Sequence, residues 1–287
     1  MSLFAASINS GSNGNCYYIG NATEGVLVDA GISCREIERR MKKLGLEIGN
    51  VKAVFISHEH SDHIRGLEVL SKKHNLPVYI NAPTLRAGAL KLQPQLAFSF
   101  RHGISITIGE LSIKPFQKHH DAADPYSFNI TGNGVTIGVF TDIGHACGNV
   151  ISHFKECHAV FLETNYDEEM LDTGFYPPYL KRRIKSDKGH LSNAQALHLF
   201  KAHRQPRLSH LFLSHLSKEN NSPQLVEQLF LQHAGTTKIV VASRYHESDL
   251  YQIKADGSAV HFQLPPRVLP AKKPLAIVPD EAQLKLF

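Results

Sequence analysis

The sequence has no long apolar run and no C-x-x-C pair, and its first residues do not resemble a signal peptide. Each of these features argues against a particular class of protein. No stretch reaches the ~18 apolar residues that a membrane-spanning helix needs, so no such helix is expected. Residues 1–7 have neither a basic start nor a long apolar core. They are therefore expected to form a first strand rather than a signal peptide.

Cysteine is scarce and scattered. The four cysteines form no C-x-x-C pair, which indicates reduced thiols in a cytoplasmic protein. They are Cys16, Cys34, Cys147 and Cys157. The net charge of +5 leans only slightly towards polyanionic partners. With 287 residues, the chain can bury a full core as one large domain or two.

Residues 57–63, Ser-His-Glu-His-Ser-Asp-His, bring three imidazoles and a carboxylate close together. They follow the apolar run 54–56, which is typical of a strand buried on both faces, and α/β folds place their sites just past such strands. One strand-to-helix turn can thus present two ligand pairs to two adjacent cations, and these ligand types suit zinc, manganese or iron. The alternative is a solvated loop in a protein with 18 histidines.

Elsewhere, predicted strands alternate with predicted helices. The glycine-rich stretch 9–15 is predicted to be a hairpin turn, because neither a helix nor a Lys-Ser/Thr pair follows it, as would be expected for a phosphate loop. Ser33, Ser192 and Ser222 are predicted helix N-caps. The predicted strands cover residues 3–7, 16–20, 25–30, 51–57, 78–80, 104–108, 111–116, 126–130, 135–141, 159–162, 208–214 and 238–243, and the helices 33–44, 64–73, 192–202 and 222–235.

The motif H-x-H-x-D-H at residues 58–63 resembles the signature of the metallo-β-lactamase fold family. The resemblance implies a mixed α/β (α+β) fold, a four-layer αββα sandwich, and two divalent metal ions. The coarse pattern of two strand-rich halves meeting at their loop ends agrees with it. There is no long insertion between Asp142 and His215, so no added nucleic-acid-clamping domain is expected.

The same resemblance implies the metal ligands. They are His58, His60 and His120 for one ion, and Asp62, His63 and His215 for the other, with Asp142 as a bridge. His120 is preferred to His119 because the family segment reads His-Asp-Ala, as residues 120–122 do; His119 is then expected to support the site or contact substrate. Asp29 matches a position that supports the site from behind, with a simple turn carboxylate as the alternative.

Two cations about 3.5–4 Å apart lower the pKa of a bound water to roughly 7, so that a hydroxide nucleophile is available at neutral pH. The same pair can neutralise charge that develops on a phosphate. A single ion could instead polarise the carbonyl of a thioester or lactam. Because the fold supports all of these reactions, the substrate must be argued from other residues.

Two segments resemble the phosphodiesterase branch of this fold, which includes RNase Z-like enzymes: Glu163-Thr164-Asn165 and residues 189–193, Gly-His-Leu-Ser-Asn. In that branch a histidine held by a glutamate protonates the leaving oxygen, a task that suits an imidazolium near neutral pH. The predicted catalytic residues are therefore His190, Glu163 and the metal ligand Asp62. The alternative for His190 is a plain helix-entry residue.

A basic, aromatic loop is predicted at residues 175–188, between these two segments. Its cations and aromatic rings fit backbone phosphates and stacked bases, and a solvated basic segment is the alternative. The predicted substrate-binding residues are Lys181, Arg182, Arg183, Lys185 and Lys188.

Taken together with the stretch 11–15, these motifs resemble the YycJ/WalJ (VicX) family over about residues 2–262. The resemblance implies a metal-dependent 5′-to-3′ DNA exonuclease, often with manganese, and the C-terminal tail described below suggests recruitment to replicating or repaired DNA. Two alternatives stay open: a small-molecule hydrolase of cyclic phosphodiesters or thioesters, and a clamp- or DNA-binding module with a vestigial site.

From about residue 264 the sequence becomes rich in proline, which is typical of an extended linker. A hydrolase domain is therefore predicted over residues 1–263 and a proline-rich tail over 264–287. The tail ends in Gln283, Leu284, Lys285, Leu286 and Phe287, which resemble the sliding-clamp-binding motif Gln-Leu-x-Leu-Phe. A DNA sliding clamp is therefore an expected partner, besides nucleic acid. A chance apolar sequence, or one that folds back on its own domain, is the alternative.

Overall fold

A computed structural model of the chain describes residues 2–256 and 259–261. The predicted clamp-binding peptide at 283–287 lies outside the described residues. None of the helices in these ranges has the length and apolar character needed to cross a membrane.

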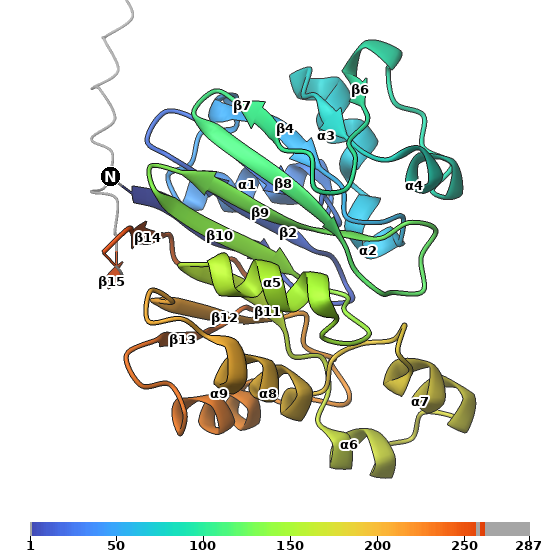
Figure 1. Ribbon diagram of the computed structural model, residues 1–287. Helices are drawn as coiled ribbons and strands as arrows, with labels where there is room; N and C mark the ends of the chain where they lie inside the picture. The colour runs from blue at the N-terminus through green and yellow to red at the C-terminus, as the bar shows by residue number, and fades with distance from the viewer. Residues whose placement is uncertain (1, 257–258, 262–287) are drawn as a thin grey trace, which may run out of the picture.

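Two sheets form the centre of the molecule (Figure 1). The first contains, in spatial order, β15 (Ala259–His261), β14 (Tyr251–Lys254), β1 (Ser2–Asn9), β2 (Cys16–Gly20), β3 (Gly25–Val28), β4 (Val51–Phe55), β5 (Val78–Tyr79) and β6 (Ala97–Phe98). The second contains β13 (Lys238–Val241), β12 (His210–Ser214), β11 (Ala159–Glu163), β10 (Val135–Phe140), β9 (Tyr126–Gly132), β8 (Leu111–Gln117) and β7 (Ile106–Ile108).

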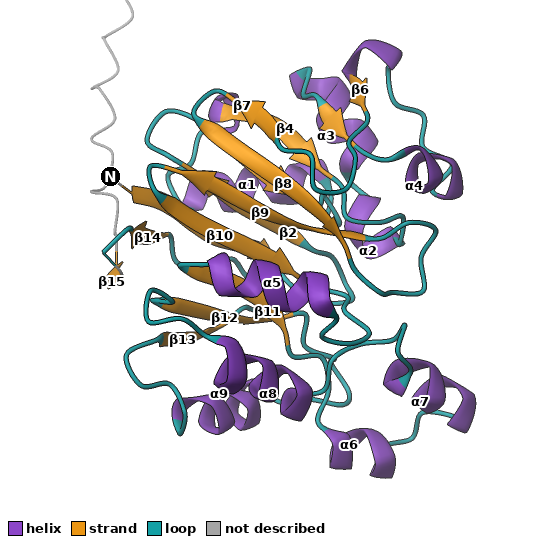
Figure 2. Ribbon diagram, in the orientation of Figure 1, coloured by secondary structure: helices purple, strands orange, loops and turns teal. Residues whose placement is uncertain are grey.

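Helices cover the outer faces of both sheets. The α-helices are α1 (Cys34–Lys43), α2 (Ser61–Ile64), α3 (Leu67–His74), α4 (Ala82–Ala87), α5 (Gly148–Glu156), α6 (Glu168–Thr173), α7 (Pro178–Lys185), α8 (Asn193–His203) and α9 (Pro223–Leu231), and the 3-10 helices are η1 (Ile48–Asn50) and η2 (Pro94–Leu96). Figure 2 shows α5, α8 and α9 over the second sheet, while α6 and α7 stand apart from this layered body.

Three apolar cores explain the layers. The central core lies between the sheets, where Phe55 of β4 meets Phe128 of β9 edge to face, with ring centroids 5.7 Å apart. A second core packs α5, α8 and α9 onto β10–β13, and a third packs α1 and α3 onto the first sheet. The order helix, sheet, sheet, helix confirms the predicted αββα sandwich.

The predicted helix at 64–73 is wrong in its extent, because the chain forms two helices, α2 and α3, with Gly66 between them. Gly66 N donates to Ala30 O at 2.8 Å, and a Cβ at this position would lie 2.0 Å from Ile32 O. The close approach of residues 30–32 thus bends the chain at Gly66 and interrupts the helix.

The predicted loop at 175–188 is also wrong in part, because α7 occupies most of it and α6 precedes it. Asp167 caps α6 by accepting a hydrogen bond from Met170 N, and Pro178 occupies the first turn of α7. By contrast, the predicted N-cap at Ser192 is confirmed, and Gln195 completes a capping box with it.

Gly31 illustrates how tightly the loops beside the sheets approach one another. Its N–H donates to Asn15 O at 2.8 Å, and an added Cβ would lie 1.6 Å from Asp62 O. Since that contact is with backbone, a side chain cannot be accommodated without moving the loop that carries Asp62.

We therefore expect Gly31→Ala to destabilise the fold by roughly 1–3 kcal/mol, the usual range for overpacking. Gly49→Ala is the matched control, because a Cβ at Gly49 meets nothing within 4 Å. Urea unfolding of both variants and the parent measures the difference. Equal stability of the two variants would contradict the close packing of these loops.

Candidate metal centre

The candidate site lies where the carboxyl ends of parallel strands meet. In the first sheet β3 runs parallel to β4, and in the second sheet β10, β11 and β12 run parallel to one another. Such strands end at the same edge of their sheet, which is where α/β folds place sites. The candidate residues at these ends are Asp29, the segment 57–63, Asp142, Glu163 and His215.

Three of these residues adopt a left-handed backbone, with φ of 62° at Asp29, 55° at Asp142 and 57° at His215. A non-glycine residue in this conformation costs about 1–3 kcal/mol and persists only where its surroundings hold it. His215 N, for example, donates to Ser10 Oγ at 2.8 Å. The strand ends therefore turn sharply at the site and are fixed by hydrogen bonds from neighbouring loops.

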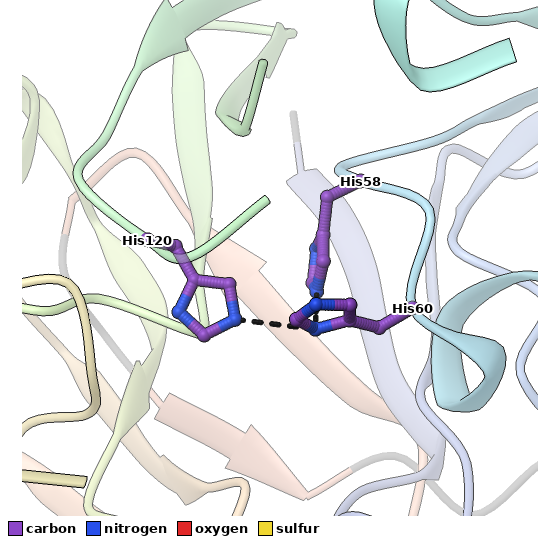
Figure 3. A group of neighbouring side chains, drawn as sticks. All are labelled: His58, His60 and His120. Atoms are coloured by element: carbon purple, nitrogen blue, oxygen red, sulfur yellow. Dashed lines mark hydrogen bonds between the residues drawn. The ribbon is translucent and has the colours of Figure 1, made fainter. Parts of the chain in front are cut away.

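Three imidazoles form the first group (Figure 3). His60 Nδ1 lies 3.1 Å from His58 Nε2 and 3.3 Å from His120 Nε2. The structure places His120 in this group, whereas the ring of His119 lies beside that of His145, with centroids 4.5 Å apart, and is exposed. Three ring nitrogens thus converge on one point from two distant loops.

The outer nitrogens of two of these rings are engaged by the protein. His120 Nδ1 donates to Gly189 O at 3.0 Å, and His58 Nδ1 lies 2.9 Å from Ser57 Oγ. Ser57 Oγ itself donates to Asp29 Oδ2 at 2.8 Å, so it accepts from His58. In both rings Nε2 is therefore left as the lone-pair nitrogen, and it faces the group, as in metal-binding histidines.

Asp29 orients a further ring as well. Its Oδ2 accepts from His63 Nδ1 at 2.7 Å, and its Oδ1 accepts from Ser57 N at 2.8 Å. The carboxylate is fully buried and holds His63 directly and His58 through Ser57. The alternative of a simple turn carboxylate is therefore wrong.

The second group consists of Asp62, His63 and His215. Asp62 Oδ2 lies 3.5 Å from both His63 Nε2 and His215 Nε2. Asn15 Nδ2 lies 3.2 Å from Asp62 Oδ2 and 3.1 Å from His63 Nε2. The turn predicted at 9–15 thus reaches into the site, which sequence reasoning did not foresee.

Asp142 lies between the two groups. Its Oδ2 is 3.1 Å from His63 Nε2, and its Oδ1 is 3.2 Å from His215 Nδ1 and 3.8 Å from His120 Nε2. One carboxylate therefore reaches imidazoles of both groups.

Glu163 and His190 adjoin the same cluster. Glu163 Oε1 accepts from His190 Nδ1 at 2.7 Å and from His215 Nδ1 at 3.0 Å, while Oε2 accepts from Ile143 N at 2.6 Å. Glu163 is fully buried, and His190 is partly exposed. Because Nδ1 of His190 is engaged, its Nε2 is the nitrogen left for exchange with a substrate.

The charges of the cluster perturb one another strongly. Burial opposes ionisation of Glu163, but the charge of His190 and hydrogen bonds from His190 and His215 lower its pKa to about 2. Burial likewise opposes protonation of His215, yet Asp142 and hydrogen bonds to Asp62 and Glu163 raise its pKa to about 10. The buried carboxylates thus favour positive charge at this site.

The donor set fits divalent cations. Asp142 Oδ2 and His215 Nε2 are buried and face other side chains of the cluster: Asp142 Oδ2 lies 3.1 Å from His63 Nε2, and His215 Nε2 lies 3.5 Å from Asp62 Oδ2. Groups of three such side chains lie with ligand atoms within 4.8 Å of one another, as at His58, His60 and His120, and at Asp62, His63 and His215. Nitrogen and carboxylate ligands at this spacing suit zinc-like ions.

Sequence reasoning also missed Lys118. Its ammonium is buried and donates to Thr141 O at 2.6 Å, next to Asp142. Burial lowers the pKa of Lys118, while Asp142 and Asp29 oppose that change. Neither Lys118 nor Asn15 belongs to a spacing motif, so only the tertiary fold brings them to the site.

The predicted substrate-binding cations lie in and after α7, outside the cluster. Two already pair with acidic side chains: Arg183 Nε donates to Asp121 Oδ2 at 2.5 Å, and Lys185 pairs with Asp172. The other three have no ion pair within the described ranges; they are Lys181, Arg182 and Lys188.

Comparisons with known proteins agree with this architecture. Residues 10–162 match the profile of the metallo-beta-lactamase superfamily. Exodeoxyribonuclease YycJ of Bacillus anthracis is 36% identical over 230 residues, covering 78% of this chain and 86% of that protein. Exodeoxyribonuclease WalJ of Streptococcus pneumoniae is 33% identical over 221 residues, covering 75% and 82%.

Among solved structures, the metallo-beta-lactamase fold protein YhfI from Bacillus subtilis aligns with a TM-score of 0.67 at 16% identity, covering 86% of this chain and 99% of that one. At this identity the likeness concerns the fold alone. The fold and the cluster of imidazoles and carboxylates together imply divalent-metal binding. The chain therefore belongs to the metallo-β-lactamase superfamily and, within it, to the family of YycJ and WalJ.

Proposed function

We propose that this chain is a metal-dependent phosphodiesterase that removes nucleotides from the 5′ end of DNA. The observation that carries the proposal is the 2.7 Å hydrogen bond between Glu163 and His190, beside a complete set of metal-ligand side chains. The relatives support the substrate, since both carry the name exodeoxyribonuclease.

Two divalent ions, of zinc, manganese or iron, are proposed for the two groups, with Asp142 shared between them. When bound, such a pair would supply an acidified water and neutralise charge on the phosphate. The proposed ligands are His58, His60 and His120 for the first ion, and Asp62, His63 and His215 for the second.

His190 is the proposed general acid. An alkoxide is a poor leaving group, and an imidazolium near neutral pH can protonate it as the bond to phosphorus breaks. Glu163 would hold the His190 ring in a fixed orientation. Asp62, whose side chain is 17% exposed, would orient the attacking water besides binding metal.

Residues 175–190, which include α7 and are called the α7 segment below, are proposed to contact nucleic-acid phosphates. Arg182 and Lys188 are exposed, while Arg183 and Lys185 would exchange their acidic partners for phosphates. Phe175 and Tyr179 are 81% and 68% exposed and offer faces on which bases can stack. This surface joins the centre through the hydrogen bond from Asp121 N to Lys188 O at 2.9 Å.

The shared position of Asp142 predicts that Asp142→Asn lowers the metal content from two ions per chain to about one or fewer, because a neutral amide cannot balance two cations. Elemental analysis after dialysis against metal-free buffer measures this. Glu169→Gln, an exposed change in α6, is the control and should retain two ions. A parent protein with a single ion, or a variant with two, would contradict the shared site.

The acid role predicts that His190→Ala lowers kcat on DNA by roughly 10²–10⁴-fold, the usual contribution of general acid catalysis. Hydrolysis of bis(4-nitrophenyl) phosphate should fall far less, because nitrophenolate leaves without a proton. Steady-state kinetics on both substrates make the comparison, with the exposed His198→Ala as control. Equal losses on the two substrates would rule out this role and leave a structural one.

Recruitment to DNA through the C-terminal peptide is a separate proposal, on residues outside the described ranges. Tethering to a sliding clamp would raise the effective concentration of the enzyme on DNA. Deleting residues 283–287 should abolish binding to the clamp while hydrolysis of free DNA stays intact. Surface plasmon resonance against immobilised clamp tests this, and undiminished binding would refute it.

A further inference from the structure

A second surface borders the metal centre at the end of β13. Strands β11, β12 and β13 are parallel, so the segment after β13 emerges at the same edge as Glu163 and His215. This segment, residues 243–248, carries Arg244 and the exposed side chain of Tyr245.

Hydrogen bonds from α1 and from the 10–15 loop fix the backbone of residues 243–248. Arg40 of α1 is buried, and its Nη2 donates to Tyr245 O at 3.0 Å. Asn13 Nδ2 donates to Arg244 O at 2.8 Å, and Ser10 N donates to Ser243 O at 3.1 Å. Tyr245 is therefore 68% exposed on a fixed backbone, a geometry suited to stacking with little loss of conformational entropy.

The guanidinium of Arg244 has unused hydrogen-bonding capacity. Its Nη2 donates to Ser12 Oγ at 3.1 Å, but its Nη1 is buried and has no partner among the described residues. No carboxylate pairs with Arg244 within those ranges either. A buried donor left unsatisfied is costly, and an arginine fork without a carboxylate matches a phosphate.

The two cationic surfaces join the centre through different loops. The α7 segment reaches it through Gly189 O, which accepts from His120, and it includes the loop of His190. Arg244 reaches it through the 10–15 loop, where Asn15 contacts His63 and Ser10 accepts from His215 N. A strand whose scissile phosphate lies in the centre would therefore meet both surfaces, one on each side of the cleaved bond.

We propose that Arg244 and Tyr245 bind the part of the strand that the enzyme retains after cleavage, Arg244 through a backbone phosphate and Tyr245 through a base. This inference rests on the proposed function. In digestion from a 5′ end, the bond between phosphorus and O3′ of the terminal nucleotide breaks, and a water oxygen bonds to phosphorus. His190 gives its proton to O3′, and the proton of the water passes to solvent.

That proton transfer sets the direction of the strand. The departing nucleotide carries O3′ and must lie on the side of His190, together with α7. The retained strand carries the phosphate and continues on the other side, towards Arg244. The α7 surface then lies on the side of the departing nucleotide, while Arg244 and Tyr245 contact the retained strand.

Binding of a fluorescein-labelled, 5′-phosphorylated single strand to the metal-loaded, cleavage-impaired His190→Ala protein tests this by anisotropy. We expect Arg244→Ala and Tyr245→Ala each to weaken binding by about tenfold. Arg244→Ala should also reduce the salt slope by ~0.7, the value for one phosphate contact on a single strand. Tyr245→Phe keeps the ring and should bind like its parent. Arg207→Ala, an exposed change before β12 at the opposite edge of the sheet, is the control.

Methylphosphonates, which are uncharged, locate the contact. Placed at the second to fourth linkages from the 5′ end, they should remove the difference between Arg244→Ala and its parent. Affinities of the Arg244 and Tyr245 variants equal to that of Arg207→Ala would overturn the proposal, as would a contact that maps to the 5′-terminal phosphate. If the parent releases no nucleotide from DNA but the affinity losses appear, the proposed function fails and the binding surface stands.

Discussion

The buried carboxylate of Asp29 is the constraint on which the rest of the centre depends. It accepts hydrogen bonds from Ser57 N, Ser57 Oγ and His63 Nδ1, and so joins the end of β3 to the turn after β4. Through Ser57 it also fixes the tautomer of His58. Asp29 thus engages the Nδ1 atoms of His58 and His63, directly or through Ser57, and leaves Nε2 of both rings facing the centre. These hydrogen bonds hold Asp29 in its left-handed backbone conformation.

The second sheet applies the same principle with Glu163. This carboxylate receives the backbone N–H of Ile143 and the ring nitrogens of His190 and His215, so it connects the proposed acid to a proposed metal ligand. Burial in the apolar layers strengthens each of these charge interactions. The sandwich therefore brings the loops together and also buries the supporting carboxylates, which strengthens their hydrogen bonds.

The sandwich and most residues of the cluster are predicted from the family that the sequence motifs resemble, and those motifs are local. H-x-H-x-D-H compresses four side chains into one turn, and apolar strands precede the other candidates. The helix break at Gly66 and the roles of Asn15 and Lys118 depend instead on what other loops bring close, which no periodicity records. Helix α5 was missed for a related reason, since its N-cap Cys147 makes no side-chain capping bond.

The ion pairs around the centre determine which cations are already neutralised by neighbouring carboxylates. The basic residues of α7 are evident in the sequence, but Arg183 and Lys185 form ion pairs with Asp121 and Asp172. Arg244 is isolated in the sequence, but the fold leaves its guanidinium partly unsatisfied beside the loop that supports His63. A cation's value for binding an anion depends on what already neutralises it, and that is fixed by tertiary structure rather than by residue counts.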